Sequence, residues 1–241
     1  MKAIILAAGR SSRLYPLTID KPKCLLKINK STVLEHQIKL LKKCGIEDIL
    51  IVTGYLEAMI REKLGDSVRY TFYGDFAKNN NLYTLYSVRD ELTKSASDVI
   101  ILFSDVLLGK DLLMRCIKGK GDFRLITDRT NITDKTMRVK IKGSCIYDIG
   151  GHIPPESGDG NFIGVAGFTQ KGARLVSAEM DSLIHRGSYT QDYYTIVFID
   201  IAKAGYCVEY IDIVNEPWIE IDYEEDYHKA ITMFGCDDGD E

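Results

Sequence analysis

The sequence has no apolar run long enough to span a membrane and no long block of like charge. Its 241 residues carry a formal net charge of −4, with acidic and basic residues interspersed. We therefore expect neither nucleic acid nor a membrane to be a main partner. The first apolar run follows Met1-Lys2 directly, so we expect no signal peptide. The length and the 45% apolar content are typical of one large α/β domain with a sizeable core.

Cysteine pairs of the C-x-x-C type are also lacking. The six cysteines are scattered along the chain, at Cys24, Cys44, Cys116, Cys145, Cys207 and Cys236. We interpret them as reduced thiols of a cytoplasmic protein, not as a zinc site or a disulfide framework. Histidine is scarce as well: none of the four lies in the motifs described below, so a soft metal has no obvious ligand set.

The chain opens with a short apolar run, residues 3–8, which is typical of a fully buried strand. Gly9 ends the run, and the loop after it carries hydroxyls and cations, namely Arg10, Ser11, Ser12, Arg13, Lys21 and Lys23. Small residues let backbone N–H groups approach a ligand closely, and the hydroxyls and cations suit a polyphosphate. Because open α/β sheets bind ligands at the carboxyl ends of their strands, this stretch predicts a phosphate-binding loop. The alternative is an ordinary strand followed by a basic loop. Neither G-x-G-x-x-G nor G-x-x-x-x-G-K-[ST] occurs in the chain.

The next segment predicts alternating helices and strands. We expect helices over residues 33–44 and 56–64 and strands over residues 48–53 and 68–73. With the first strand this is a βαβαβ order, which implies right-handed crossovers and a largely parallel sheet. Two further strands are expected over residues 98–103 and 122–127.

The pattern changes over residues 128–161. Residues 137–141 alternate with period two, residues 146–149 are candidates to pair with them, and a glycine- and proline-rich loop follows. We interpret this segment as a β-rich flap inserted into the α/β layout, not as a separate domain. Beyond it we expect a strand, two helices and a late strand, over residues 162–168, 171–185, 191–204 and 205–212. Residues 1–235 are thus expected to form one domain, and residues 236–241 a frayed acidic tail.

Carboxylates follow two of these segments. Asp105 comes directly after the strand over residues 98–103, near the same sheet edge as the opening loop; an ordinary turn or N-cap aspartate is the alternative. Glu220 and Asp222 alternate along residues 217–223, so on a strand they share a face. They would repel each other unless a cation lies near them, although a solvated edge strand explains the same pattern.

A run of asparagines precedes Leu82 and Tyr83. The plain interpretation is a turn in which Asn80 caps a helix running to about residue 91. A helix N-terminus beside a ligand can also border a binding pocket, and both interpretations can hold together.

Residues 6–23 resemble, position by position, the signature of nucleotidyltransferases with a GT-A-like fold, L-A-A-G-x-[GS]-x-R-L-x-P-L-T followed by P-K. Ser11 and Ser12 replace the frequent glycine-serine pair, which we expect to alter the loop geometry without removing the hydroxyl. Residues 80–86 and the Trp-Ile-Glu-Ile-Asp run at 218–222 resemble the CTP-dependent phosphocholine and 2-aminoethylphosphonate cytidylyltransferases of this superfamily. The resemblance implies a single GT-A-like, Rossmann-like α/β domain with a mixed, mostly parallel sheet between helices.

The resemblance also implies roles for individual residues. Nucleotide binding falls to Leu6, Ala7, Ala8, Gly9, Arg10, Ser11, Ser12, Gly54, Asn80 and Ser104. Lys23 is expected on the α-phosphate and Arg13 on the β- and γ-phosphates, the alternative for Lys23 being a solvated loop lysine. Asp105 and Asp222 are expected to hold Mg²⁺, with Glu220 as a third carboxylate, direct or through water. The acceptor is expected near Asn81, Tyr83, Asp192, Tyr194, Trp218 and Arg129. Core packing explains the aromatics at least as well, and helix capping is the alternative for Asp192.

The activity implied is transfer of CMP from CTP to a small phosphonate or phosphomonoester, with release of pyrophosphate. An anionic acceptor needs no general base, so catalysis reduces to positioning and charge neutralisation. We favour 2-aminoethylphosphonate as acceptor, with phosphocholine a close second, in a monomer or homodimer. The alternatives are a sugar-1-phosphate nucleotidyltransferase and a non-catalytic nucleotide-binding protein. A glycosyltransferase is disfavoured, because Ser104-Asp105-Val106 lacks a D-x-D pair.

Overall fold

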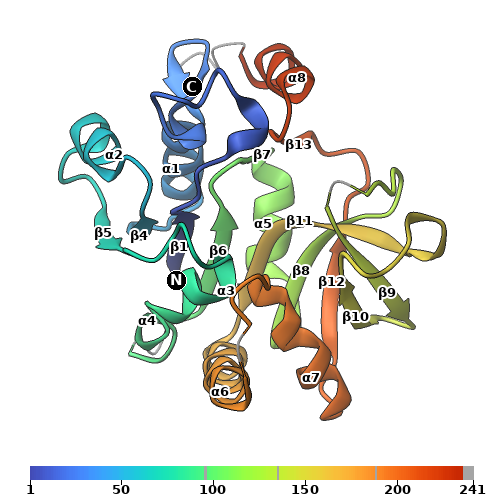
Figure 1. The fold of residues 1–241 in the computed structure, drawn as a ribbon. Coiled ribbons are helices and arrows are strands. Elements are labelled where there is room, and N and C mark those ends of the chain that lie inside the picture. The colour runs from blue at the N-terminus through green and yellow to red at the C-terminus, as the bar shows by residue number, and fades with distance from the viewer. Residues whose placement is uncertain (95–96, 135, 188, 236–241) are drawn as a thin grey trace.

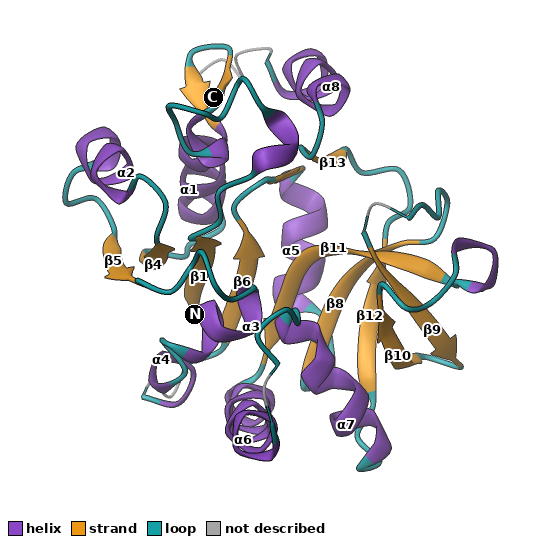
Figure 2. Cartoon of the chain, in the orientation of Figure 1, coloured by secondary structure: helices purple, strands orange, loops and turns teal. Residues whose placement is uncertain are grey.

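A computed structural model describes residues 1–94, 97–134, 136–187 and 189–235. Within these residues nine strands form one sheet in the order β5-β4-β1-β6-β11-β8-β12-β10-β9, with helices on both faces (Figures 1 and 2). The strands of this sheet are β1 (Lys2–Ala7), β4 (Asp48–Thr53), β5 (Arg69–Phe72), β6 (Val99–Phe103), β8 (Phe123–Asp128), β9 (Met137–Lys142), β10 (Cys145–Gly150), β11 (Gly160–Phe168) and β12 (Val208–Asp212). Two short pairs lie outside it, β2 (Lys27–Ile28) with β3 (Ser31–Thr32), and β7 (Val106–Leu108) with β13 (Trp218–Glu220). The helices are α1 (Val33–Lys43), α2 (Glu57–Leu64), α3 (Asn81–Tyr86), α4 (Asp90–Thr93), α5 (Lys110–Lys118), α6 (Gln170–Arg186), α7 (Val197–Lys203) and α8 (Glu224–Phe234).

The N-terminal half of the sheet is parallel. β1 lies between β4 and β6 and is parallel to both, and β5 extends this part on the far side of β4. Every residue of β1 is buried, because helices cover both faces of the sheet there. Since parallel strands end at the same edge, the segments that follow β1, β4 and β6 meet at one place.

The other half of the sheet is mixed. β11 is antiparallel to both β6 and β8, whereas β12 and β8 are parallel. β9 and β10 form the expected hairpin at the edge, and β11 also pairs with β9. The flap is therefore continuous with the main sheet through β11, and parallel pairing dominates only in the N-terminal half.

Two apolar layers hold the helices on the sheet. On one face α3, α4, α6 and α7 pack over residues such as Ile4 and Leu6, and on the other α1, α2 and α5 pack over Ala3 and Ile5. These residues alternate along β1, so each strand face supplies one layer. α1 begins where expected, because Thr32 and Glu35 form a capping box.

Two helix predictions were imprecise, and neither α5 nor α8 was predicted. The helix expected over residues 191–204 begins as a helical turn at Tyr194–Ile196 and becomes α7 only at Val197. The segment before this turn is not helical and contacts α3, because the carbonyl of Asp192 accepts a hydrogen bond from Leu82 N at 3.3 Å. The helix expected to run to residue 91 ends at Tyr86, with α4 as a separate turn.

The interpretation of all cysteines as reduced thiols is wrong for one pair. Cys145 and Cys207 form a disulfide, with their Cα atoms 5.2 Å apart. They lie 62 positions apart in the sequence, and this spacing does not indicate that they pair. They meet because β10 and β12 are neighbouring strands. Cys24 and Cys116 are free and fully buried, and burial raises the pKa of each thiol to about 12. Cys236 and the tail at residues 236–241 lie outside the described residues.

Among the described residues, no helix combines the length and the apolar character needed to cross a lipid bilayer.

Candidate active site

A polar cavity of about 500 Å³ opens at the carboxyl ends of β1 and β6. It is lined by the opening loop (residues 6–13 and 22–24), by residues 76–81 and Thr84, by residues 103–105, and by Gln191, Tyr193 and Glu220. Nine of the ten residues expected to bind nucleotide line this cavity, namely Leu6, Ala7, Ala8, Gly9, Arg10, Ser11, Ser12, Asn80 and Ser104. The structure thus brings the opening loop, the asparagine run and Asp105 to one place.

Gly54 is the remaining residue of the ten, and it lies against the backbone of the opening loop at Ala8. The N–H of Tyr55 donates a hydrogen bond to the carbonyl of Ala8 at 3.0 Å. A Cβ atom on Gly54 would lie 2.7 Å from that same carbonyl oxygen and 2.9 Å from the Phe76 ring. Only glycine lets the end of β4 approach the loop this closely.

The loop itself is held in a defined conformation. Ser11 has a φ of 53°, in the left-handed region that glycine favours, and its carbonyl accepts a hydrogen bond from Thr18 Oγ1 at 2.9 Å. The Arg10 guanidinium lies over the rings of Tyr55 and Phe76, 6.0 and 5.7 Å from their centroids. Ser11 is thus held in a backbone conformation that glycine adopts more readily than other residues.

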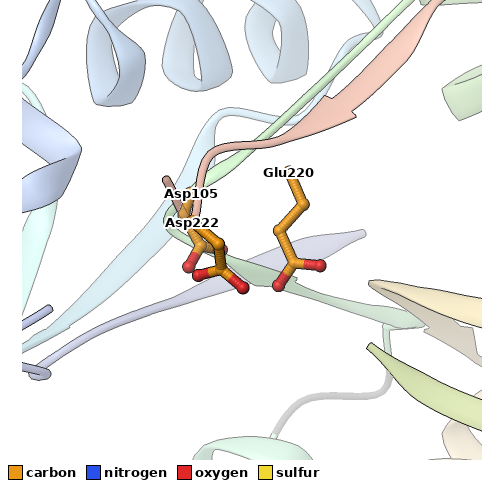
Figure 3. A group of neighbouring side chains, drawn as sticks. All are labelled: Asp105, Glu220 and Asp222. Carbon is orange, nitrogen blue, oxygen red and sulfur yellow. The ribbon is translucent and has the colours of Figure 1, made fainter. Parts of the chain in front are cut away.

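Three carboxylates lie close together (Figure 3), and two of them, Asp105 and Glu220, line the cavity. Asp105, Glu220 and Asp222 each offer an oxygen within 4.8 Å of the others. β13 positions them, because it pairs antiparallel with β7, and the N–H of Ile221 donates a hydrogen bond to the carbonyl of Asp105 at 3.0 Å. The strand ends at Glu220, and Asp222 follows it at the start of the turn into α8.

Two cations face these carboxylates. Lys23 Nζ lies 2.7 Å from Asp105 Oδ2 and 2.9 Å from Asp222 Oδ1, and Arg13 Nη2 lies 2.9 Å from the same Asp222 oxygen. Lys23 is 8% exposed. Burial by itself would lower the pKa of Lys23, but the two aspartates outweigh it and raise that pKa. The alternative of a solvated loop lysine is thereby excluded.

Three carboxylates share this cluster with two cations, Lys23 and Arg13. Burial first, and then the neighbouring Asp105 and Asp222, raise the pKa of Glu220 well above its usual value. Among the described residues, the buried oxygens Asp105 Oδ1 and Asp222 Oδ2 accept no hydrogen bond. Oxygen atoms left without donors, in a site with an excess of carboxylates, fit a hard divalent cation such as Mg²⁺.

The residues expected to bind the acceptor are more dispersed. Asn81 lines the cavity, and its Oδ1 accepts a hydrogen bond from Tyr194 N at 2.8 Å. Tyr194 is fully buried and packs edge-on against Phe103 and Phe162, which makes it a core residue. Tyr83 packs at the edge of the same core cluster.

Three others, Trp218, Arg129 and Asp192, are not among the described residues that line the cavity. Trp218 Nε1 donates a hydrogen bond to Asp128 Oδ2 at 3.1 Å. Arg129 Nη1 lies 3.6 Å from Asp212 Oδ2, and its guanidinium stacks over Tyr210. The backbone carbonyl of Asp192 accepts a hydrogen bond from Leu82 N, in the first turn of α3. Within the described residues, the cavity lining includes none of Tyr83, Asp192, Tyr194, Trp218 and Arg129.

Sequence reasoning missed Gln37 of α1. Its Nε2 donates hydrogen bonds to the carbonyls of Phe103 (2.8 Å) and Val106 (2.7 Å), which flank the turn carrying Asp105. A polar residue on the apolar face of a helix was the available signal, because Gln37 shares that face with Val33 and Leu41. Gln191 and Tyr193, which flank Asp192 in the sequence, also line the cavity.

Comparisons with known proteins found similar sequences and similar structures. Residues 2–122 match the Nucleotidyl transferase family. The chain is 31% identical over 233 residues to the choline-phosphate cytidylyltransferase of Streptococcus pneumoniae, covering 95% of this chain and 96% of the relative. It is 32% identical over 135 residues to the CTP:phosphoglutamine cytidylyltransferase of Campylobacter jejuni, covering 54% and 53% of the two chains. A solved structure of the CTP:phosphocholine cytidylyltransferase from Streptococcus pneumoniae superposes with a TM-score of 0.77 at 28% identity, over 96% of this chain and 97% of that one. The chain is therefore a member of the nucleotidyl transferase family, and it has the α/β fold of these enzymes.

Proposed function

We propose that this protein is a cytidylyltransferase that transfers CMP from CTP to a small phosphonate or phosphomonoester with an amino head group. The observation that carries the proposal is the meeting of Lys23, Asp105 and Asp222 at the cavity formed by the opening loop. A cation and acidic residues beside a phosphate-binding loop suit the transfer of a phosphoryl-linked group. The choice of CTP is supported by the names of the two relatives.

The nucleotide is proposed to lie along the opening loop. Backbone N–H groups of residues 6–12 and the Ser11 and Ser12 hydroxyls would face the phosphates, and Arg13 would bind the β- and γ-phosphates. Lys23 would bind the α-phosphate and offset the negative charge that develops there. Asn80 and Ser104 line the same cavity and complete the proposed nucleotide site.

The reaction needs no general base from the chain. A phosphonate or phosphate oxygen of the acceptor is already anionic near neutral pH, and it forms a bond to the α-phosphorus as the bond to pyrophosphate breaks. Asp105 and Asp222, with Glu220 directly or through water, would hold Mg²⁺, which neutralises charge on the α-phosphate and on the leaving pyrophosphate. The chain contributes orientation and charge.

The acceptor is proposed to be 2-aminoethylphosphonate or phosphocholine. The stretches at residues 137–139 and 160–164 resemble the phosphonate enzymes, whereas the Streptococcus pneumoniae relative is named for choline phosphate. The cavity lining includes Tyr193 and Gln191, and aromatic and amide side chains suit an amino or quaternary ammonium group. We propose a cytoplasmic reaction by a monomer or homodimer.

The test is pyrophosphate release with Mg²⁺ from each of the common nucleoside triphosphates, against a panel of acceptors. The panel contains 2-aminoethylphosphonate, phosphocholine, phosphoethanolamine and glucose-1-phosphate. We expect release with CTP and one amino head group, lost in Asp105→Ala and retained in Asp111→Ala, which removes an exposed carboxylate of α5. Release only with the sugar phosphate would instead make the protein a sugar-1-phosphate nucleotidyltransferase. No release with any pair would contradict the proposal.

A further inference from the structure

The carboxylates proposed to bind metal are already paired with cations of the chain. Lys23 Nζ contacts both aspartates, at 2.7 Å from Asp105 Oδ2 and 2.9 Å from Asp222 Oδ1. Arg13 approaches the same Asp222 oxygen at 2.9 Å. The Lys23 ammonium thus lies between two carboxylates from distant parts of the sequence, one in the turn after β6 and the other in the segment that follows β13.

Lys23 and a divalent cation cannot share this position. A metal ion bound through the free oxygens Asp105 Oδ1 and Asp222 Oδ2 would share both carboxylates with Lys23 and would lie within a few ångströms of the ammonium. Like charges at that separation repel strongly in a buried site. Binding of a metal ion there requires that Lys23 moves away. Its flexible four-carbon side chain makes such a movement feasible without displacement of the backbone.

The opening loop offers a second position for the Lys23 ammonium. The cavity that Lys23 lines continues along residues 6–13, where the proposed triphosphate would place several negative charges. An anionic phosphate there competes with the aspartates for the ammonium. Once Lys23 has moved, its ammonium no longer offsets the negative charges of Asp105 and Asp222, which lie next to Glu220.

We propose that Lys23 is a resident counter-cation that closes the carboxylate site to divalent metal until a nucleotide draws it away. This inference rests on the proposed function, because it takes the nucleotide to be the anion that displaces Lys23. It makes Lys23 a determinant of binding order: the nucleotide-free protein has low affinity for metal, and metal and triphosphate enter together. The proposal concerns the ion pair seen in the structure and adds to the expected contact of Lys23 with the α-phosphate.

The test is binding of Mn²⁺, which replaces Mg²⁺ as a spectroscopic probe, measured in the absence of nucleotide by the EPR signal of free Mn²⁺. Lys23→Met should bind Mn²⁺ at least about tenfold more tightly than the wild-type chain, because three carboxylates lose their main counter-charge. Mn²⁺ should also raise the melting temperature of this variant and leave that of the wild type almost unchanged. Lys21→Met is the matched control: it removes the same charge from the same loop, at a lysine whose Nζ lies 3.9 Å from Asp20.

Two further variants keep the result interpretable. Lys23→Gln can still donate hydrogen bonds to the aspartates and serves if Lys23→Met does not fold without metal. Lys23→Met combined with Asp222→Asn should lose the gained affinity, which locates the metal in this cluster.

Equal Mn²⁺ affinity in the wild type and in a folded Lys23 variant would overturn the proposal, as would tight binding that survives Asp222→Asn. The pyrophosphate assay separates this failure from that of the function. If the wild-type enzyme is active and the variants bind Mn²⁺ no more tightly, only the inference about Lys23 is contradicted. A gain in Mn²⁺ affinity in a protein that releases no pyrophosphate sinks only the proposed function.

Discussion

Gln37 Nε2 in α1 holds the turn that carries Asp105, donating hydrogen bonds to the carbonyls of Phe103 and Val106 at 2.8 and 2.7 Å. Gln37 is 1% exposed, so its removal leaves buried carbonyl groups without a donor. Gln37→Leu should lower the free energy of unfolding by about 2 kcal/mol. It should also lower kcat by roughly ten- to a hundredfold, because Asp105 loses its fixed position.

The measurement is urea unfolding together with steady-state kinetics below the melting range. Lys39→Ala, on the exposed side of the same helix, is the control and should change neither quantity. A Gln37→Leu enzyme with normal kcat would show that the turn is held by other contacts.

The close contact of Gly54 with the opening loop leads to a prediction about nucleotide affinity. Gly54→Ala places a Cβ 2.7 Å from the Ala8 carbonyl oxygen, so the opening loop must shift. We expect the KM for CTP to rise about tenfold or more, since loop backbone groups are proposed to bind the phosphates. Gly74→Ala is the control, because its Cβ would meet nothing closer than 3.6 Å. Equal KM values in the two variants would contradict the proposed role of the loop.

The lowered pKa of Glu216 makes the free energy of unfolding depend on pH. Burial alone would raise the pKa of Glu216, but hydrogen bonds from the N–H of Val214 and from Arg115 outweigh it and lower that pKa to about 2. A carboxyl with a lowered folded-state pKa contributes stability above its unfolded pKa, near 4.3, and loses it as the pH falls towards about 2. The stability difference between the wild type and Glu216→Gln should therefore be largest near neutral pH and shrink below about pH 4. Chemical unfolding at several pH values measures this difference, and a constant difference across the range would contradict the assigned cause.

The disulfide between Cys145 and Cys207 is open to direct test. Proteolytic peptides of the unreduced protein should contain these two cysteines linked, with Cys24 and Cys116 as free thiols. In the loop-closure account, a cross-link over 62 positions contributes up to about 4 kcal/mol, so Cys145→Ser should lower the free energy of unfolding by at most this amount. Mass spectrometry of unreduced peptides and urea unfolding measure the two effects. Recovery of both cysteines as free thiols from the native protein would refute the pairing.

Local pattern was enough to predict the parallel half of the sheet and the opening loop. β1, β4 and β6 are continuous apolar runs, and a small-residue break follows β1, so both strand and loop can be found within a few residues. Asp105 was predicted for the same reason, because its place at the end of a buried strand fixes the sheet edge at which it lies. The hairpin of β9 and β10 was also visible as period-two alternation.

The rest depends on contacts between distant segments. Tyr194 follows Asp192 by two positions, yet it is buried because Phe103 and Phe162 close around it, and neither is near it in sequence. Trp218 is held by Asp128, 90 positions away, and this partner decides where the indole points. Such pairings are set by the packing of the whole chain, and local propensity carries no information about them.

The ion pair between Lys23 and Asp222 spans 199 positions, and this separation has a consequence during synthesis. A ribosome releases the loop with Lys23 long before it has made Asp222, so the nascent chain carries that loop without one of its two carboxylate partners. The parallel strands can already pair at that stage, because β1, β4 and β6 all lie in the first half of the chain. The proposed active site is complete only when β13 emerges and pairs with β7, so under this proposal catalytic competence is one of the last properties that translation confers.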